Sequence, residues 1–241
     1  MLQMEKVSKI YRVGDIETRA LRDITLKIEA GEFIAITGPS GSGKTTLLNV
    51  CGMLETIESG TYRFDGQDVS RLSDSQASRI RNEKIGFVFQ SYNLIPDLSV
   101  FANIEAPLRY RRFSARERKE RVDGALAKVG LSNRAKHRPP QLSGGQQQRV
   151  AIARAIAGSP RMIFADEPTG NLDSEMSQEV MRLLGEINRE GCTIVMVTHN
   201  EAHVGLATRN IHILDGRLAQ RTAQAVPSPL ATESADAVVV A

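Results

Sequence analysis

The sequence predicts an α/β fold in which a parallel sheet is preceded by an antiparallel β segment and interrupted by an inserted helical region. Apolar runs at 162–165 and 193–197 alternate with helix-patterned segments, which is typical of parallel strands joined by crossover helices. A glycine-rich loop follows the apolar run 33–36. From about 91 to 141 the pattern is helical and shows no convincing strand, which indicates an insertion.

The first ninety residues contain most of the predicted strands outside the parallel sheet. Strands are expected at 2–7, 21–28 and 33–37, the second because its apolar residues alternate at period two. Asp65-Gly66 after the run 60–64 is a hairpin signal. The set Ser73-Asp74-Ser75-Gln76 has capping-box spacing and predicts a helix start, and 85–89 predicts a short strand that ends at Gln90.

The helical insertion carries a strongly basic run. Ser114 to Glu117 is a second capping box, and apolar residues at helical spacing follow it until Gly130. The cations of the run are Arg109, Arg111, Arg112, Arg116, Arg118, Lys119 and Arg121. Two interpretations remain open: a solvated helix face, or attraction to anionic lipid headgroups or an acidic partner.

The remainder of the chain completes the predicted organisation. Asp215-Gly216 between two short apolar runs predicts a closing hairpin, and the Ala/Pro/Ser-rich end predicts a mobile tail. No internal repeat is found, so one sheet with one such glycine-rich loop is expected per chain. The predicted division is a core of residues 1–90 and 142–221, a helical subdomain of 91–141 and a flexible tail of 222–241.

Composition restricts the class of protein without choosing a function. The 241 residues have a formal net charge of +3, which by itself says little about nucleic acid or membrane binding. Cys51 and Cys192 lie far apart without a metal-ligand pattern, so both are expected to be buried thiols in a reducing compartment. Neither a signal-peptide layout nor an apolar run of roughly 18 residues occurs. We therefore expect a cytoplasmic chain whose membrane role would need a partner.

The glycine-rich loop fits the phosphate-binding pattern G-x-x-x-x-G-K-[ST]. In this pattern backbone N–H groups converge on phosphates, Lys44 reaches the β- and γ-phosphates, and the Thr45 hydroxyl ligates Mg²⁺. The alternative is an ordinary Gly/Ser-rich turn. The predicted nucleotide-binding residues here are Gly38, Pro39, Ser40, Gly41, Ser42, Gly43, Lys44, Thr45 and Thr46.

Two acidic residues follow the apolar strand 162–165. Ligands bind at the carboxyl ends of parallel strands, so Asp166 is a candidate Mg²⁺ ligand beside the phosphate loop. Glu167 is a candidate general base that would activate a water molecule for attack on the γ-phosphorus. The alternative is that both are surface acids at a strand end, without a metal-binding or catalytic role.

From residue 1 to about 221 the chain resembles the ATPase subunits of ABC transporters, because several motifs occur in the family's order. Leu142-Ser143-Gly144-Gly145-Gln146 is identical to the family's signature motif, and Asn171-Leu172-Asp173 is similar to its D-loop. Gln90 stands in the position of the Q-loop glutamine, His199 in that of the switch histidine, and Tyr11 in that of the aromatic that stacks on adenine.

The resemblance implies roles for these residues beside plainer alternatives. Gln90 would sense Mg²⁺ and the attacking water, or be an ordinary strand-end amide, and His199 would donate to the γ-phosphate. The plainer alternative for Ser143 to Gln146 is a capping box that starts a helix. The plainer alternative for Asp173 is that it caps the helix that begins at Ser174. By resemblance, the signature residues and Asp173 would contact the nucleotide held by another copy of the chain. His137, His203 and His212 are expected to be structural.

The resemblance further implies an ATP- and Mg²⁺-dependent ATPase that acts as a head-to-tail homodimer on two integral membrane permease subunits. Its expected location is the cytoplasmic face of the inner membrane, with no nucleic-acid partner. The stretches QLSGGQQQR and ADEPTGNLDS are similar to the macrolide-exporter, lipoprotein-release and cell-division (MacB, LolD, FtsE) group. The ATPase of a small-solute ABC importer is the alternative, and a soluble ABC ATPase acting on DNA repair or ribosomes is less favoured.

Overall fold

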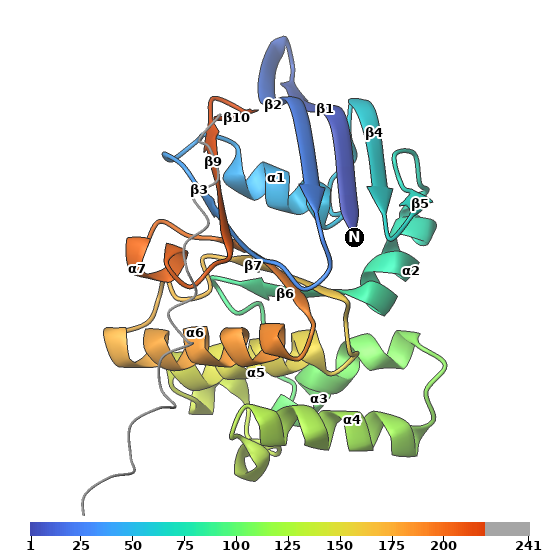
Figure 1. Cartoon of the computed structure of the whole chain (residues 1–241). Helices are drawn as coiled ribbons and strands as arrows, with labels where there is room; N and C mark the ends of the chain where they lie inside the picture. Colours follow the sequence, from blue (N-terminus) through green and yellow to red (C-terminus); the bar gives the residue numbers. More distant parts are fainter. Residues whose placement is uncertain (220–241) are drawn as a thin grey trace, which may run out of the picture.

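The structure is a computed structural model, and it describes residues 1–219 as two sheets and a set of helices (Figure 1). The predicted tail at 222–241 lies outside the described residues. An antiparallel sheet has the strand order β2-β1-β4-β5. Its strands are β1 (Leu2–Val13), β2 (Ile16–Ile28), β4 (Ser59–Phe64) and β5 (Gln67–Asp68).

The second sheet has six strands in the order β10-β9-β3-β8-β7-β6. Neighbouring strands from β9 to β6 pair in parallel, and β10 alone pairs antiparallel. The carboxyl ends of the parallel strands therefore share one edge, which places the phosphate loop after β3 beside the acids after β7. The strands are β3 (Phe33–Thr37), β6 (Ile85–Phe89), β7 (Met162–Asp166), β8 (Thr193–Val197), β9 (Arg209–Leu214) and β10 (Arg217–Leu218).

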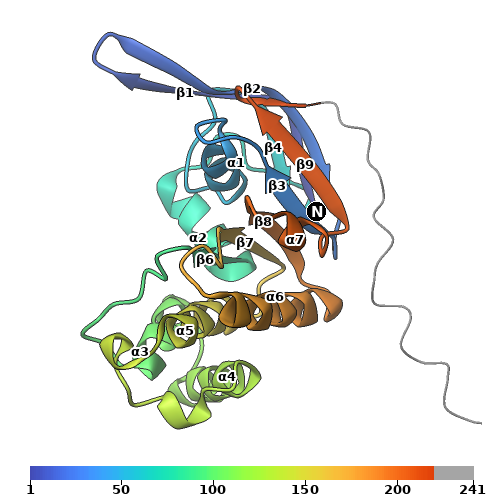
Figure 2. The same cartoon turned by 90° about the vertical axis from the view of Figure 1, so that its left-hand side faces the viewer.

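The first hairpin is longer than the sequence pattern predicts. β1 and β2 continue past the expected ends at residues 7 and 21 and turn at Gly14-Asp15. The outer part forms a ribbon that projects beyond the rest of the molecule (Figure 2). Its side chains have no core to bury against, so it lacks apolar alternation, and Val13 and Ile16 remain 76% and 71% exposed. Ion pairs from Arg12 to Glu17 and Glu58 support the ribbon.

Three helices begin with the capping boxes that the sequence predicts, at Ser73, Ser114 and Ser143. The helices are α1 (Lys44–Cys51), α2 (Asp74–Lys84), α3 (Val100–Glu105), α4 (Ala115–Lys128), α5 (Gly144–Ile156), α6 (Ser174–Arg189) and α7 (Glu201–Val204). Short 3₁₀ segments are η1 (Ala106–Tyr110), η2 (Ser132–Arg134) and η3 (Pro139–Gln141). None of the helices in residues 1–219 has the length and apolar character needed to span a bilayer.

The parallel sheet is buried on both faces, and β3 shows how. Phe33 and Ala35 pack into a core with α3 to α6, whereas Ile34 and Ile36 pack into a second core that contains α1 and the antiparallel sheet. Helix α1 consequently lies between the two sheets (Figure 1). The phosphate loop at its start is therefore held by rigid elements on both sides. Cys51 is fully buried as expected, whereas Cys192 is only half-buried.

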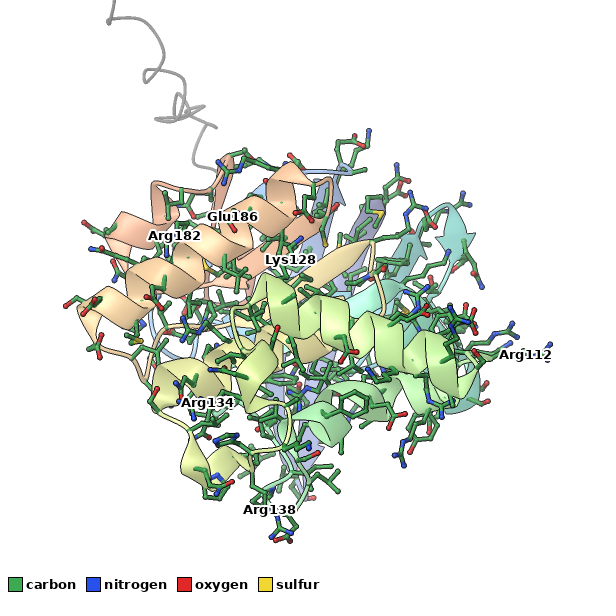
Figure 3. The ribbon with its side chains drawn as sticks, turned by 90° about the horizontal axis from the view of Figure 1, so that it is seen from below. Arg112, Lys128, Arg134, Arg138, Arg182 and Glu186 are labelled. Atoms are coloured by element: carbon green, nitrogen blue, oxygen red, sulfur yellow. The ribbon has the colours of Figure 1, made fainter. Side chains whose placement is uncertain are left out.

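Most cations of the basic run are engaged within the protein. Arg109 and Arg118 pair with the buried Glu105, and Arg111 donates to backbone carbonyls of Asn82 and Gly158. Arg116 and Lys119 form ion pairs within α4, and Arg121 lies over the Phe113 ring. Arg112 is exposed and projects from the periphery in the view from below (Figure 3). This pattern favours a structural and solvated face over a lipid-binding one.

Candidate nucleotide site

The phosphate loop requires glycine where the backbone passes closest to its neighbours. Gly38 and Gly43 have φ values of 149° and 104°. A Cβ on Gly38 would lie 2.1 Å from the carbonyl oxygen of Ile213, and one on Gly43 would lie 2.5 Å from that of Ala20. Any larger residue would therefore push the loop away from the strands that hold it.

Lys44 and Ser42 give the loop the chemistry of an anion site. The Lys44 ammonium donates to the carbonyls of Gly38 (3.0 Å) and Pro39 (2.8 Å), so its charge is held over the loop. The Ser42 hydroxyl is buried and has no hydrogen-bond partner among the described residues. Such an orphaned polar atom beside a cation and a helix N-terminus fits a phosphate ligand.

Thr45 and Asp166 meet at the start of α1 and the end of β7. The Thr45 side chain lies close enough to the Asp166 carboxylate to lower the pKa of that group. Burial, together with the neighbouring Glu167 charge, raises the pKa of Asp166, while the Thr45 side chain and the Lys44 charge oppose that shift. Among residues 1–219 no group of three or more His, Cys, Asp or Glu side chains could hold a metal ion. One carboxylate and one hydroxyl nevertheless fit Mg²⁺, which takes few protein ligands when substrate phosphates supply others.

Glu167 and His199 form the second pair of the site. His199 Nδ1 lies 2.5 Å from Glu167 Oε2, and the two side chains are 73% and 20% exposed. Glu167 has φ 47°, a left-handed conformation that is unusual for a residue with a side chain. Its N–H donates to the carbonyl of Val197 on the neighbouring strand (3.0 Å), which helps to hold this conformation. Strain of this kind is often found at functional sites.

A cavity of about 750 Å³ collects most of the predicted nucleotide residues. It runs from the first hairpin to the carboxyl ends of β6 and β7. The predicted residues that line it are Tyr11, Ser40, Gly41, Gly43, Lys44, Thr45, Thr46, Gln90, Asp166 and Glu167. The hairpin therefore forms one wall of the space and the phosphate loop another.

Gln90 joins this cavity to the loop after β7. Its amide donates to the Asn171 side chain (3.2 Å), and Asn171 donates back to the Gln90 carbonyl (3.1 Å). Phe89 pairs with Asp166 in the sheet register, which explains why the residue after β6 reaches the carboxylates.

The signature residues and Asp173 do not line this cavity. Ser143 and Gln146 exchange hydrogen bonds as a capping box at the start of α5, with Gly144 and Gly145 between them. Asp173 accepts from the Met176 N–H (2.8 Å) as the cap of α6. The structure thus supports the capping interpretation within one chain. Gly38, Pro39, Ser42 and His199 also lie outside the cavity lining, and His199 lines an adjoining cavity of about 830 Å³ together with Glu167.

Several cavity residues escaped the sequence analysis. Thr18, Arg19 and Arg22 of β2 and Asp215 of the closing hairpin face the same space. Thr18 pairs with Tyr11 across the hairpin, so only the strand register could have identified it. His203, which was expected to be structural, is buried and hydrogen-bonds the Thr169 hydroxyl (3.2 Å).

Comparisons with known proteins agree on one family. The ABC transporter family profile matches residues 21–170, more than half of the chain. The chain is 48% identical over 218 residues to the ABC transporter ATP-binding protein YvrO of Bacillus subtilis, covering 90% of this chain and 95% of that protein. It is 46% identical over 228 residues to the macrolide export ATP-binding/permease protein MacB of Marinobacter nauticus, covering 95% of this chain but only 35% of MacB.

A solved structure agrees as well. The ATP-binding cassette MJ0796, in a dimeric post-hydrolysis state bound to ADP and Pi, superimposes with a TM-score of 0.85 at 42% identity. The superposition covers 94% of this chain and 99% of that one. Taken with the cleft between the hairpin and the phosphate loop, these matches establish that the chain belongs to the ABC transporter family as an ATP-binding subunit.

Proposed function

We propose that this chain hydrolyses MgATP in a head-to-tail homodimer and passes the nucleotide state to two integral membrane permease subunits. The proposal rests on one observation: Thr45 reaches Asp166 and His199 reaches Glu167 at the mouth of the phosphate loop. A pair of metal ligands and an oriented carboxylate therefore stand beside the position that the γ-phosphate of a bound nucleotide would occupy.

The roles of the residues follow from their chemistry. Lys44 would hold the β- and γ-phosphates, and Thr45 and Asp166 would hold Mg²⁺, assisted by Gln90. When bound, Mg²⁺ would neutralise charge on the phosphate oxygens. Glu167 would accept a proton from the attacking water, while His199 would orient Glu167 and donate to the γ-phosphate. Tyr11, on the hairpin wall, would stack on the adenine.

The proposed dimer gives the signature residues a ligand. Ser143 to Gln146 stand at a helix N-terminus but do not line the cavity of their own chain. A second copy, turned head to tail, would bring its γ-phosphate to this positive helix end, with Asp173 nearby. The dimeric state named for the MJ0796 cassette supports this arrangement.

A groove of about 870 Å³ supports permease docking. It lies between α2, β6 and η1, close to Gln90, and its lining includes Leu54, Phe87, Phe89 and Tyr110. Tyr110 and Leu54 are 86% and 42% exposed, so the groove offers uncovered apolar surface at its rim. We assign this groove to a cytoplasmic segment of the permease, which would place the chain at the cytoplasmic face of the inner membrane. The MacB relatives, named as joined ATP-binding/permease proteins, favour a MacB-like exporter or mechanical role over an importer.

The decisive experiment is tandem purification of the tagged chain from detergent-solubilised membranes, with Mg²⁺-dependent ATPase activity assayed in the eluate. We expect an integral membrane protein to co-purify and ATP to be hydrolysed. Substitution of Tyr110 by Asp should release the membrane protein without loss of hydrolysis. An active chain that co-purifies with no membrane protein would contradict the permease assignment.

A further inference from the structure

Helix α5, which begins at the signature residues, is tied by one buried side chain to the loop that carries Glu167. Gln148 is fully buried, and its Nε2 donates to the carbonyl of Pro168 at 2.6 Å. Its orientation is unambiguous, because a carbonyl can only accept and the amide must turn its NH₂ toward it. Gln148 lies about one helical turn beyond Gly144, and Pro168 directly follows Glu167.

The loop after Glu167 is held at three successive places by different elements. Gln148 of α5 binds Pro168, His203 of α7 pairs with Thr169, and Gln90 after β6 pairs with Asn171. Within the loop, Gly170 N–H donates to the Glu167 carbonyl (3.0 Å) and Leu172 N–H to the Thr169 carbonyl (3.1 Å). Three other elements thus hold the loop that continues from the left-handed Glu167.

A displacement of the Gln148 side chain would be transmitted to Glu167 with little loss of amplitude. The pyrrolidine ring fixes φ at Pro168, which removes one torsion between the Glu167 Cα and the carbonyl that Gln148 holds. A residue before proline is itself restricted in its backbone angles. The chain from the α5 side chain to the catalytic carboxylate is therefore short and stiff.

Helix α5 is also attached to α6 along its first turns. Because the two helices brace one another, we expect α5 to move as a rigid unit with little bending. Arg149 forms an ion pair with Glu179 of α6 at 2.6 Å. A Cβ on Gly145 would lie 2.6 Å from the Met176 sulfur, which shows how closely the two helices approach. They run side by side beneath the parallel sheet (Figures 1 and 2).

We infer that Gln148 is a positioning residue that couples the signature end of α5 to Glu167 of the same chain. The inference rests on the proposed function, in which the nucleotide of a second copy binds at Ser143 to Gln146. Arrival of that nucleotide would move α5, and Gln148 would bring the Pro168 carbonyl and Glu167 into their hydrolytic positions. The base would then act only in a closed dimer.

The test compares two glutamines of the same helix in the full chain. Gln148→Met keeps the side-chain shape but cannot donate to Pro168. Gln147→Met is the matched control, because Gln147 donates to the Leu142 carbonyl (3.1 Å), outside the Glu167 loop. Pro168→Ala is a second variant that keeps the Pro168 position's carbonyl and its hydrogen bond from Gln148 while restoring torsional freedom to the backbone.

The first readout is hydrogen exchange of the backbone amides of residues 169–173, which follow Pro168, and it is independent of catalysis. We expect faster exchange in Gln148→Met, and no change in Gln147→Met. Unchanged exchange in Gln148→Met would overturn the inference whether or not the chain hydrolyses ATP. The absence of hydrolysis in the unmodified chain would count against the proposed function instead, and exchange would still decide the role of Gln148.

The second readout separates positioning from binding. We expect kcat for MgATP to fall by about tenfold or more in Gln148→Met and by a smaller factor in Pro168→Ala, with KM changed by less than about twofold, because neither side chain touches the nucleotide. ATP-driven dimerisation in a Glu167→Gln background should persist. Two results would show a merely structural role: a kcat equal to that of Gln147→Met, or a raised KM together with a loss of ATP-driven dimerisation.

Discussion

His199 Nδ1 lies 2.5 Å from Glu167 Oε2, and this contact joins residues that follow two neighbouring parallel strands. Asp166 and Val197 are register partners at the ends of β7 and β8, so the next residues of both strands emerge at the same edge of the sheet. The sheet thereby brings together a carboxylate and an imidazole more than thirty positions apart in the sequence.

Replacement of Glu167 by Gln should preserve ATP binding and slow hydrolysis by roughly 10²–10⁴-fold, because the amide cannot accept the proton of the attacking water. Steady-state phosphate release and equilibrium binding of a fluorescent ATP analogue measure the two effects. The exposed Glu120→Gln on α4 is the control and should behave like the unmodified chain. Near-normal turnover in Glu167→Gln would remove the carboxylate from the role of base.

Replacement of Lys44 by Ala should weaken nucleotide binding itself by tenfold or more, since the loop would lose the only cation that contacts its carbonyls among the described residues. Isothermal titration with MgATP checks this result. Lys27→Ala, which removes an exposed cation paired with Glu29, should bind as the unmodified chain does. Equal affinities in the two variants would contradict the assignment of the phosphate loop.

Ser143→Arg should abolish hydrolysis while leaving binding to the chain's own cavity intact, because Ser143 does not line that cavity. A mixture of Ser143→Arg and Lys44→Ala chains is more informative. In a head-to-tail dimer, the intact phosphate loop of the first would face the intact signature residues of the second. We expect the mixture to hydrolyse ATP at a rate that neither variant reaches alone. A mixture without ATPase activity would argue against a shared site.

Asp166 should destabilise the nucleotide-free protein at neutral pH. Burial raises the pKa of Asp166 in the folded protein above its ordinary unfolded value. Between these two pKa values the folded state holds more protons than the unfolded state, so the free energy of unfolding falls as pH rises through that window. Asp166→Asn should therefore raise the Tm of the nucleotide-free protein at neutral pH, with a gain that shrinks on acidification, and should abolish Mg²⁺-dependent hydrolysis.

Asp68→Asn is the control, because its effect on the Tm should be opposite in sign to that of Asp166→Asn. Hydrogen bonds from the Ser70 side chain and backbone lower the pKa of Asp68, so its charged form is favoured by folding. Its removal should lower the Tm or leave it unchanged at neutral pH. A lower Tm in Asp166→Asn than in the unmodified protein would show that the Asp166 carboxylate is not penalised by burial.

Local signals in the sequence predicted local structure well. The capping boxes at Ser73, Ser114 and Ser143 and the turns at Asp65-Gly66 and Asp215-Gly216 all occur where expected, because each depends on side chains within a few residues of one another. The outer half of the first hairpin was missed because a solvent-exposed ribbon needs no apolar alternation.

The family and the kinds of side chain at the candidate site follow from sequence alone, because the phosphate loop, the strand-end acids and the signature run are contiguous patterns. Which of these groups come together follows from the three-dimensional fold: Thr45 with Asp166, Glu167 with His199, and Gln148 with Pro168. These contacts depend on strand order and helix packing across dozens of residues, and no short window of sequence records them.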